Sequence, residues 1–211
     1  MNKKYDDEEP ENLMTTPHFT MKKPFLLFAA FALLAGSAVA QSSTWTIDPA
    51  HSEAHFEVRH MSVSNVRGSI GGVSGTVVWD PANPANDSVN ATLDVTTIDS
   101  GNSYRDKDLK TDAFFNTDKF KTIVFKSTSV TPSGSGLKIA GTLTIAGVTR
   151  PVVLDSTAPA APQKGLQGGL VTGIEATITI KRADFNIGGK YPSMVISDDV
   201  KITIDAEMDK K

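Results

Sequence analysis

The sequence of 211 residues contains no cysteine. Disulfides, thiol catalysis and thiolate metal sites are therefore excluded, and the fold must be held together by its core alone. An excess of charge of one sign is also missing, since 21 basic residues stand against 24 acidic ones. Such a balance gives no basis for nucleic-acid binding. The sequence also lacks a G-x-S-x-G elbow, a phosphate-binding loop, a dinucleotide fingerprint and a recognisable internal repeat.

Residues 21–40 have the three-part organisation of a secretory signal peptide. Lys22 and Lys23 precede an apolar run over residues 25–34, and the small residues Ala38-Val39-Ala40 follow it. We expect cleavage before Gln41 and a periplasmic mature protein. The run is shorter than the roughly 20 apolar residues of a membrane-spanning helix. The processed protein is therefore expected not to span a membrane, although an uncleaved anchor is the alternative.

Residues 1–20 do not fit a signal peptide. They include an acidic run with a proline over residues 6–11, which is too polar to bury a core. We interpret them as a disordered upstream extension, with Met21 as the true start. Residues 41–211 then form the mature chain, with 17 basic and 19 acidic residues. Its length suits one domain with a substantial core.

The mature sequence alternates apolar and polar residues with a period of two. The clearest runs cover residues 89–95, 137–145, 174–180 and 200–206, and shorter ones lie around 56–60, 75–79, 122–127 and 152–154. Each run has one apolar and one polar face, which is typical of antiparallel strands that cover an interior. Turn signals separate the runs at about regular spacing. The sequence therefore predicts an all-β fold of about eight strands, either a closed barrel or a sandwich.

The alternation also predicts which side chains face the interior. They are Phe56, Val58, Leu93, Ile123, Phe125, Leu143, Ile145, Ile178, Ile180, Ile202 and Ile204. The opposite phase would turn Thr142, Thr177, Thr179 and Thr203 inward. Small residues at Ala91, Gly141 and Ala176 lie on the same faces. An eight-stranded barrel is either filled by its side chains or holds one small ligand, and alternation alone leaves both open. If a tunnel exists, Gly141→Leu or Ala176→Phe should reduce ligand capacity in a folded protein.

One segment departs from the strand pattern. Ser103 and Asp106 have the spacing of a capping box, and Asp106 and Lys110 stand four residues apart. We predict a short helix over residues 104–110 that packs across one barrel end through Phe114 and Phe115. The glycine-rich stretch 71–75 is predicted to be a bend or bulge between strands.

The densest group of ionisable residues lies at 51–60 and comprises His51, Glu53, His55, Glu57 and His60. On a strand the first four would share one face and His60 the other. A zinc site needs three or four converging ligands with supporting groups, and no second cluster exists elsewhere in the sequence. We therefore predict no metal site. His60 is predicted to be an inward polar group at a barrel mouth.

Several motifs together resemble the YceI-like family of exported, lipid-binding proteins. They run in order through nearly the whole mature chain: Trp45–Ser52, Phe56–His60, Val66–Gly68, Tyr104–Lys110, Phe114–Asn116, Val124–Thr128, Gly141–Pro151, Lys181–Ile187 and Ser197–Val200. Each motif is weak by itself, but their order is specific. The chain departs from the pattern at Ile70 and Val73, where aromatic residues are expected, and at Lys121, where proline is usual.

The resemblance implies an eight-stranded antiparallel, lipocalin-like barrel with a short helix and an elongated apolar tunnel. It implies binding of polyisoprenoid chains or similar long amphiphiles, with no general catalytic activity and no cofactor. The eleven inward residues would then be the tunnel wall. His60, Arg105 and Arg150 are the candidates for contact with a lipid head group. A homodimer is left open.

Two other functions compete with lipid carriage. A hydrolase or isomerase would use His51 or His60 with a carboxylate, and would need a histidine–carboxylate hydrogen bond that opens onto a cleft. An exported interaction or stress protein would have a barrel filled by its own side chains. An extractable lipid in the native protein would separate these alternatives from carriage.

Overall fold

The computed structural model describes residues 42–166 and 168–211. The predicted upstream extension at 1–20 and the predicted signal peptide at 21–40 lie outside the described residues, as does Gln41. No helix within the described part of the chain is long and apolar enough to cross a bilayer.

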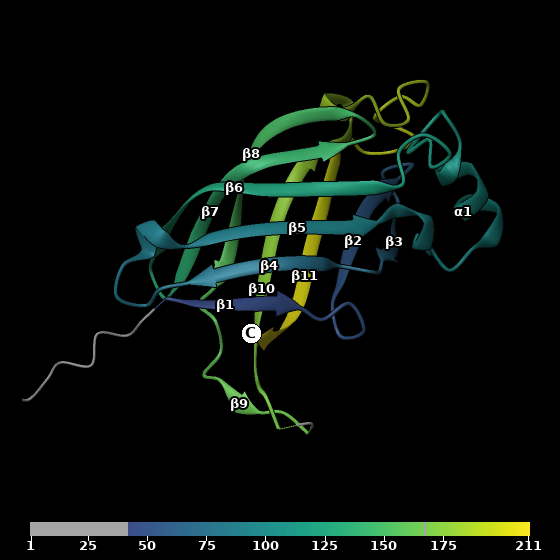
Figure 1. Cartoon of the computed structure of the whole chain (residues 1–211). Coiled ribbons are helices and arrows are strands. Elements are labelled where there is room, and N and C mark those ends of the chain that lie inside the picture. The colour runs from purple at the N-terminus through teal and green to yellow at the C-terminus, as the bar shows by residue number, and fades with distance from the viewer. Residues whose placement is uncertain (1–41, 167) are drawn as a thin grey trace, which may run out of the picture. The chain divides into compact units, whose positions relative to one another are not determined.

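The described chain is built almost entirely of strands (Figure 1). The strands are β1 (Ser43–Ile47), β2 (Glu53–His60), β3 (Ser64–Ile70), β4 (Ser74–Trp79), β5 (Ser88–Asp94), β6 (Thr122–Ser133), β7 (Gly136–Ile145), β8 (Val148–Thr157), β9 (Gln163–Lys164), β10 (Leu170–Lys181) and β11 (Asp199–Lys210). The helical elements are α1 (Ser103–Lys110) and three short 3₁₀ turns, η1 (Pro84–Asn86), η2 (Val95–Thr97) and η3 (Arg182–Phe185).

Eight of these strands close into an antiparallel barrel, as the sequence predicts. The order around the ring is β1, β4, β5, β6, β7, β8, β10 and β11, and β11 pairs again with β1. Closure pairs most of the strand edges, which protects a sheet that has no disulfides, and the weakest junction is between β8 and β10. The longest strand pairing is that of β10 with β11, which is continuous from Val171 to Lys181 of β10. In contrast, β8 and β10 pair at only two positions.

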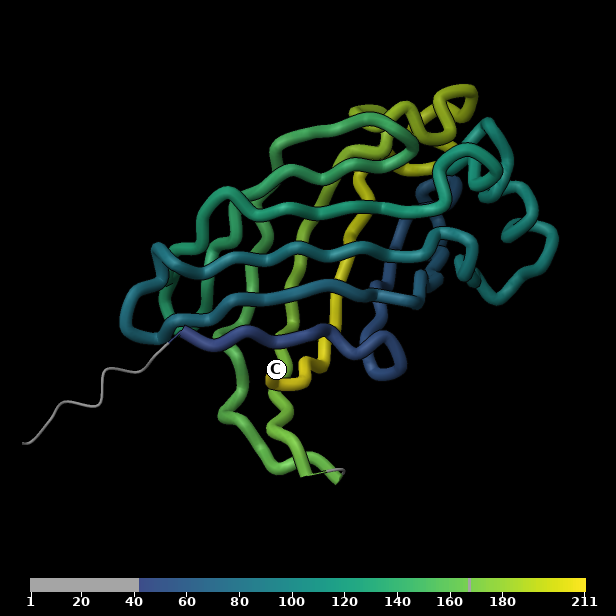
Figure 2. The backbone as a smooth tube through the Cα atoms, viewed as in Figure 1, coloured from purple at the N-terminus to yellow at the C-terminus, as the bar shows by residue number. Residues whose placement is uncertain are grey.

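The barrel has two different ends, which the chain trace in Figure 2 shows. At one end, the β2–β3 hairpin extends the wall along the first half of β11, and α1 and the loop 186–198 lie at the same end. At the other end, η1, the β6–β7 turn and the β9 arm project beyond the ring. We call the first the helix end and the second the arm end.

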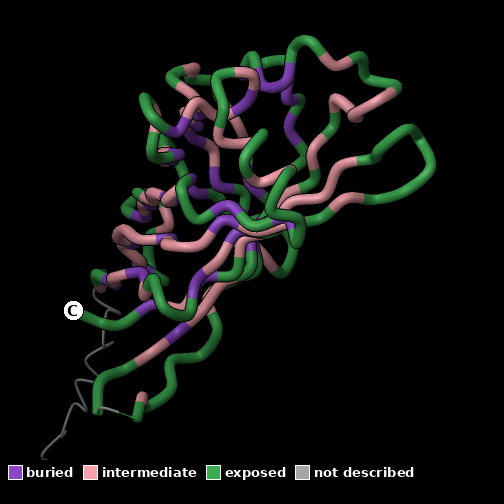
Figure 3. The backbone as a smooth tube through the Cα atoms, turned by 90° about the vertical axis from the view of Figure 1, so that its right-hand side faces the viewer, coloured by how far each residue is buried: buried purple, intermediate pink, exposed green. Residues whose placement is uncertain are grey.

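The predicted strand phase is confirmed by the burial pattern, which alternates along the strands (Figure 3). In β7, for example, Leu137, Ile139, Gly141, Leu143 and Ile145 are buried and the four residues between them are not. The predicted bend at 71–75 joins β3 to β4, and Gly72 and Gly75 have positive φ. A β-carbon at Gly75 would lie 2.0 Å from the Asn90 carbonyl oxygen, so only glycine fits there.

Some elements differ from the prediction. Helix α1 begins at Ser103 and not at Tyr104, and its N-cap is Asn102, whose side chain accepts from the amides of Tyr104 and Arg105. The predicted Ser103 capping box is therefore wrong, because Asp106 accepts from Ser100 instead. Strands β1, β3 and β9 were not among the predicted runs, and β1 takes a place in the ring whereas the predicted strand at 56–60 is β2 of the hairpin. Strand β3 is missed because only Val66 and Ile70 give it apolar character in an otherwise polar run.

Candidate functional site

The barrel encloses a cavity of about 570 Å³. This volume lies within the roughly 300–1,000 Å³ of typical small-molecule sites. Side chains from both the ring and the β2–β3 hairpin form its wall, and most are aliphatic or aromatic. The barrel is therefore not filled by its own side chains. An apolar cavity of this size selects ligands by shape and apolar area, since it offers few hydrogen bonds.

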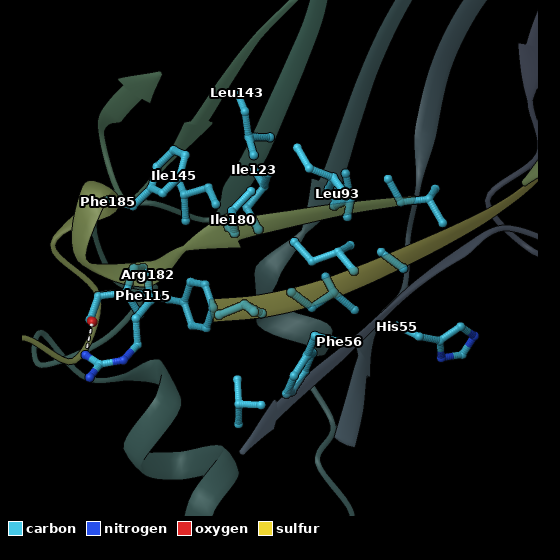
Figure 4. Close-up of a pocket in the computed structure, with 18 of the residues that line it drawn as sticks. His55, Phe56, Leu93, Phe115, Ile123, Leu143, Ile145, Ile180, Arg182 and Phe185 are labelled. Atoms are coloured by element: carbon cyan, nitrogen blue, oxygen red, sulfur yellow. Dashed lines mark hydrogen bonds between the residues drawn. The ribbon is translucent and has the colours of Figure 1, made fainter. Parts of the chain in front are cut away.

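All eleven side chains that the alternation predicts to face inward lie on the cavity wall. Figure 4 shows Leu93, Ile123 and Ile180 directed into a common space. The four threonines of the opposite phase, Thr142, Thr177, Thr179 and Thr203, are not on the wall. Contact between these eleven residues and a ligand stays a prediction.

Gly141 corrects one expectation. An added β-carbon there would lie 2.4 Å from the Lys126 carbonyl oxygen and 2.7 Å from Cζ of Phe125. The ring of Phe125 lies over Gly141, so the glycine is covered and does not border the cavity. Gly68 has the same relation to Phe56, whose Cζ would be 2.4 Å from its β-carbon. Both glycines let a phenyl ring lie against the sheet, which keeps the centre of the barrel open.

The arm end of the cavity is closed. Trp45, Val130 and Leu137 are buried there but do not line the cavity, so they fill the barrel below it. The polar side chains on the wall come mainly from the helix end and include His60, Asn102, Tyr104, Arg105 and Asp108. The cavity therefore has an apolar interior and a polar mouth at the helix end.

A network around Ser100 fixes Arg105 at the mouth. The Arg105 guanidinium donates from Nε to the Ser100 hydroxyl at 2.8 Å and from Nη2 to the Ser100 carbonyl at 2.7 Å. Asp106 accepts from the Ser100 amide and hydroxyl, and the hydroxyl bond is the main cause that lowers the pKa of Asp106. Ser100 is buried, so it is a rigid anchor. Arg105 is therefore a positioned cation at the mouth of the cavity.

The other two head-group candidates have different outcomes. His60 lies on the wall at the mouth and pairs through a β-bridge with Ile196. Arg150 is exposed, donates to the Thr149 carbonyl and does not line the cavity. Arg150 pairs with the inward-facing Leu143 across β7 and β8, but its side chain does not reach the cavity. Along this half of β8 there is no ladder with β10, whose pairing with β8 is confined to Ala176 and Thr177.

Arg182 lies on the cavity wall, and no role was predicted for it from the sequence. Its buried guanidinium donates to the backbone carbonyls of Ser197, Ile187, Gly188, Tyr191 and Ile196, at 2.6–3.1 Å. All five guanidinium N–H groups are used. Figure 4 shows the guanidinium turned toward the backbone. One side chain thus folds the loop 186–198 into the cavity wall. This role could not be predicted from the sequence, because the acceptors are backbone carbonyls and no partner side chain marks them.

The histidine-rich segment lies mostly on the outer surface. His51 Nδ1 is 2.6 Å from Asp48 Oδ2 and 3.7 Å from Glu207 Oε1. The hydrogen bond with Asp48 is the main cause that raises the pKa of His51. The three residues are not on the cavity wall. His55 is among the residues that line the cavity, but its ring points away from the other labelled side chains in Figure 4 and its Nε2 lies 3.5 Å from Glu53 Oε2. A histidine–carboxylate bond is present, but it does not open onto the cavity.

Comparison with known proteins places this architecture in a family. The family model of the YceI-like domain matches residues 45–208. Protein YceI of Escherichia coli is 38% identical over 169 residues, which cover 79% of this chain and 88% of that protein. The crystal structure of Burkholderia cenocepacia BcnA superposes with a TM-score of 0.69 at 24% identity, over 76% of this chain and 98% of BcnA.

A polyisoprenoid binding domain from Saccharophagus degradans, implicated in plant cell wall breakdown, superposes with a TM-score of 0.58. It is 15% identical, and the match covers 79% of this chain and 98% of that domain. At 15% identity, the similarity shows a shared fold and nothing more specific. The family-model match spans the barrel from β1 to β11, and the sequence identity to Protein YceI is well above that to either solved structure. The chain therefore belongs to the YceI-like family.

Proposed function

We propose that this protein binds a long isoprenoid or similar amphiphilic lipid within the barrel and carries it without chemical change. The observation that carries the proposal is the 570 Å³ cavity with an apolar interior and polar groups gathered at one mouth. An amphiphile matches this distribution, with its tail in the barrel and its head group near Arg105 and His60. The polyisoprenoid binding domain with the same fold supports the choice of ligand class.

Energetics indicate what should decide affinity. Burial of a methylene group contributes about 0.8 kcal/mol. A tail of about 40 carbons would formally give ~30 kcal/mol, which exceeds the practical limit of about 20 kcal/mol for non-covalent binding. Ordering the flexible tail must offset much of this gain. The fit between tail length and cavity length should therefore matter more than any single contact.

A chain-length series tests the proposal. Delipidated protein would be titrated with prenyl alcohols of increasing length, and with n-alkanols of equal carbon number as a matched series. We expect affinity to rise steeply with each isoprene unit and then level off when the tail exceeds the cavity. Equal affinity for prenyl alcohols of every length would contradict the proposal. It would also be contradicted if a short, polar alcohol bound as tightly as the long prenyl alcohols.

We also propose that the protein acts in the periplasm after removal of residues 1–40. The short apolar run and the Ala38-Val39-Ala40 site support this. N-terminal sequencing of exported protein should give Gln41 as the first residue. A mature species that still starts near Met1 would contradict it.

A further inference from the structure

Three exposed apolar side chains lie together beside the cavity mouth. Met61, Val63 and Met194 are 51%, 79% and 72% exposed. Met61 and Val63 belong to the β2–β3 turn, and Met194 belongs to the loop 186–198. The two segments are joined, because the Met61 amide donates to the Val195 carbonyl at 2.9 Å. Single exposed apolar residues are ordinary, but a group from two joined segments indicates a contact surface.

The backbone holds the hydrophobic residues of the β2–β3 turn on the surface. Met61 and Ser62 have φ of 52° and 58°, in the left-handed region that is uncommon for such residues. The Val63 amide donates a hydrogen bond to the His60 carbonyl at 3.0 Å, which closes the turn. The residues next to these exposed ones, His60 and Val195, line the cavity. The exposed apolar surface is thus continuous with the cavity wall.

Two tyrosine–lysine pairs border the same mouth. Tyr104 is 80% exposed and lines the cavity, and Lys107 Nζ lies 5.9 Å from its ring centroid. Tyr191 also lines the cavity, with Lys190 Nζ 5.3 Å from its ring centroid. Tyrosine, with an apolar ring and a polar hydroxyl, is favoured at membrane interfaces, and lysine is attracted to anionic head groups.

The charge of these segments differs from that of the whole chain. Residues 58–67 contain Arg59 and Arg67 and no acidic residue, and Arg67 pairs with Glu57 outside this range. The loop 186–198 contains Lys190 and Asp198 and is neutral. Helix α1 has three basic and two acidic residues. Residues 58–67 and helix α1 are therefore net basic, whereas the whole chain has a net charge of −3. This asymmetry would orient the helix end toward an anionic surface.

We propose that Met61, Val63, Tyr104 and Met194, which we call the rim, dock onto a bilayer that contains anionic lipids. The rim inserts among the head groups, and the basic side chains around it contact lipid phosphates. Docking places the cavity mouth against the apolar layer, so that a lipid tail enters without crossing water. The role in lipid entry rests on the proposed function, but the docking itself does not.

Flotation with vesicles tests the docking. The protein purified after export is mixed with vesicles of phosphatidylethanolamine and phosphatidylglycerol, or of phosphatidylcholine alone. We expect binding to the anionic vesicles that weakens with salt. The combined variant Met61→Asn, Val63→Thr and Met194→Gln should lower the partition coefficient at least about tenfold. Asparagine suits the left-handed backbone at position 61, so the turn is preserved.

Matched variants separate the rim from general effects. Leu166→Gln removes a fully exposed leucine at the arm end and should leave vesicle binding unchanged. Lys107→Gln and Lys190→Gln should each weaken binding to anionic vesicles about fivefold and leave binding to phosphatidylcholine unchanged. Thermal unfolding of every variant verifies that the fold is kept.

The result that would overturn the proposal is equal vesicle binding by the wild type, the rim variant and Leu166→Gln, or no binding by any of them. A wild-type dimer that the rim variant converts to a monomer, without vesicle binding, would assign the rim to self-association and also overturn it. Lipid extracted from the same preparations separates the two proposals. Vesicle binding without cavity lipid supports docking and contradicts lipid carriage, whereas cavity lipid without vesicle binding does the reverse.

Discussion

At the scale of single residues, Arg182 determines the shape of the cavity wall. Its five hydrogen bonds collect carbonyls from one loop, and no carboxylate within the described residues lies within 4.0 Å of it. A buried charge without a counter-ion is stabilised here by carbonyl dipoles alone. The loop thus depends on one side chain, and lysine cannot replace it because it has three donors from a single atom.

Arg182→Leu should lower the free energy of unfolding by at least about 3 kcal/mol, because it leaves several buried carbonyls without donors. Urea denaturation monitored by tryptophan fluorescence measures the loss. Arg150→Leu is the control, since that side chain is exposed and the change should stay within about 0.5 kcal/mol. A loss of less than about 1 kcal/mol for Arg182→Leu would contradict the assigned role.

His51 gives a pH-dependent prediction. The hydrogen bond with Asp48 raises the pKa of His51 above 6.5. The pair therefore stabilises the folded protein fully below about pH 6.5, and this contribution is lost as the pH rises through the folded pKa of His51. An NMR titration should give a midpoint for His51 above 6.5.

Asp48→Asn should shift that midpoint back toward 6.5. Glu207→Gln should have a smaller effect, since Glu207 lies farther from the imidazole. A His51 midpoint at or below 6.5 in the wild type would show that the Asp48 bond is not formed in solution.

At the scale of strands, the small inward residues differ in what surrounds them. Gly141 on β7 is covered by Phe125, whereas Ala176 on β10 lies on the cavity wall but is only 3% exposed. Ala91 on β5 is half-buried and lies on the cavity wall. Of the two cavity-lining alanines, Ala91 is therefore the one with more space for an added side chain.

Ala91→Leu should reduce bound lipid per protein and change the thermal midpoint by no more than a few degrees. The leucine occupies ligand volume without displacing a packed neighbour. Asn90→Leu on the same strand is the matched control, because its side chain faces out and lipid content should not change. Unchanged lipid content in Ala91→Leu, measured by mass spectrometry of an organic extract, would argue against binding along this part of the wall.

Gly141→Leu should behave differently from Ala91→Leu. Its side chain would collide with the Lys126 carbonyl and the Phe125 ring, so overpacking should cost at least about 1–3 kcal/mol. Thermal unfolding checks this, with Thr142→Leu on the opposite face as the control. A stability equal to that of the wild type would mean that Phe125 does not lie over the glycine.

Alternation predicted the strand phase because each strand has one face toward an interior and one toward water. It predicted neither the capping of α1 by Asn102 nor strand β3. The cap depends on the position of the chain before the helix, and β3 is recognised only by its pairing with β2. The roles of Arg182 and Gly141 were also not predictable, since both are set by contacts with residues far along the chain or across strands.

At the scale of the whole molecule, the barrel is asymmetric along its axis. Trp45 and Leu137 help to fill the arm end, and polar residues border the cavity at the helix end. Within the described residues, the polar groups of the cavity wall thus gather mainly at the helix end. The exposed rim and the net basic segments lie at this same end. One end of the molecule therefore combines access to the cavity with the surface features of membrane contact.

The central claim is that the barrel holds a lipid in the cell. The most direct test is mass spectrometry of an organic extract from protein purified, without detergent, from its native compartment. The account predicts about one long-chain amphiphile per protein, with a narrow range of tail lengths and a strongly reduced amount in Ala91→Leu. An extract without lipid, from protein that also fails to take up prenyl chains, would contradict it.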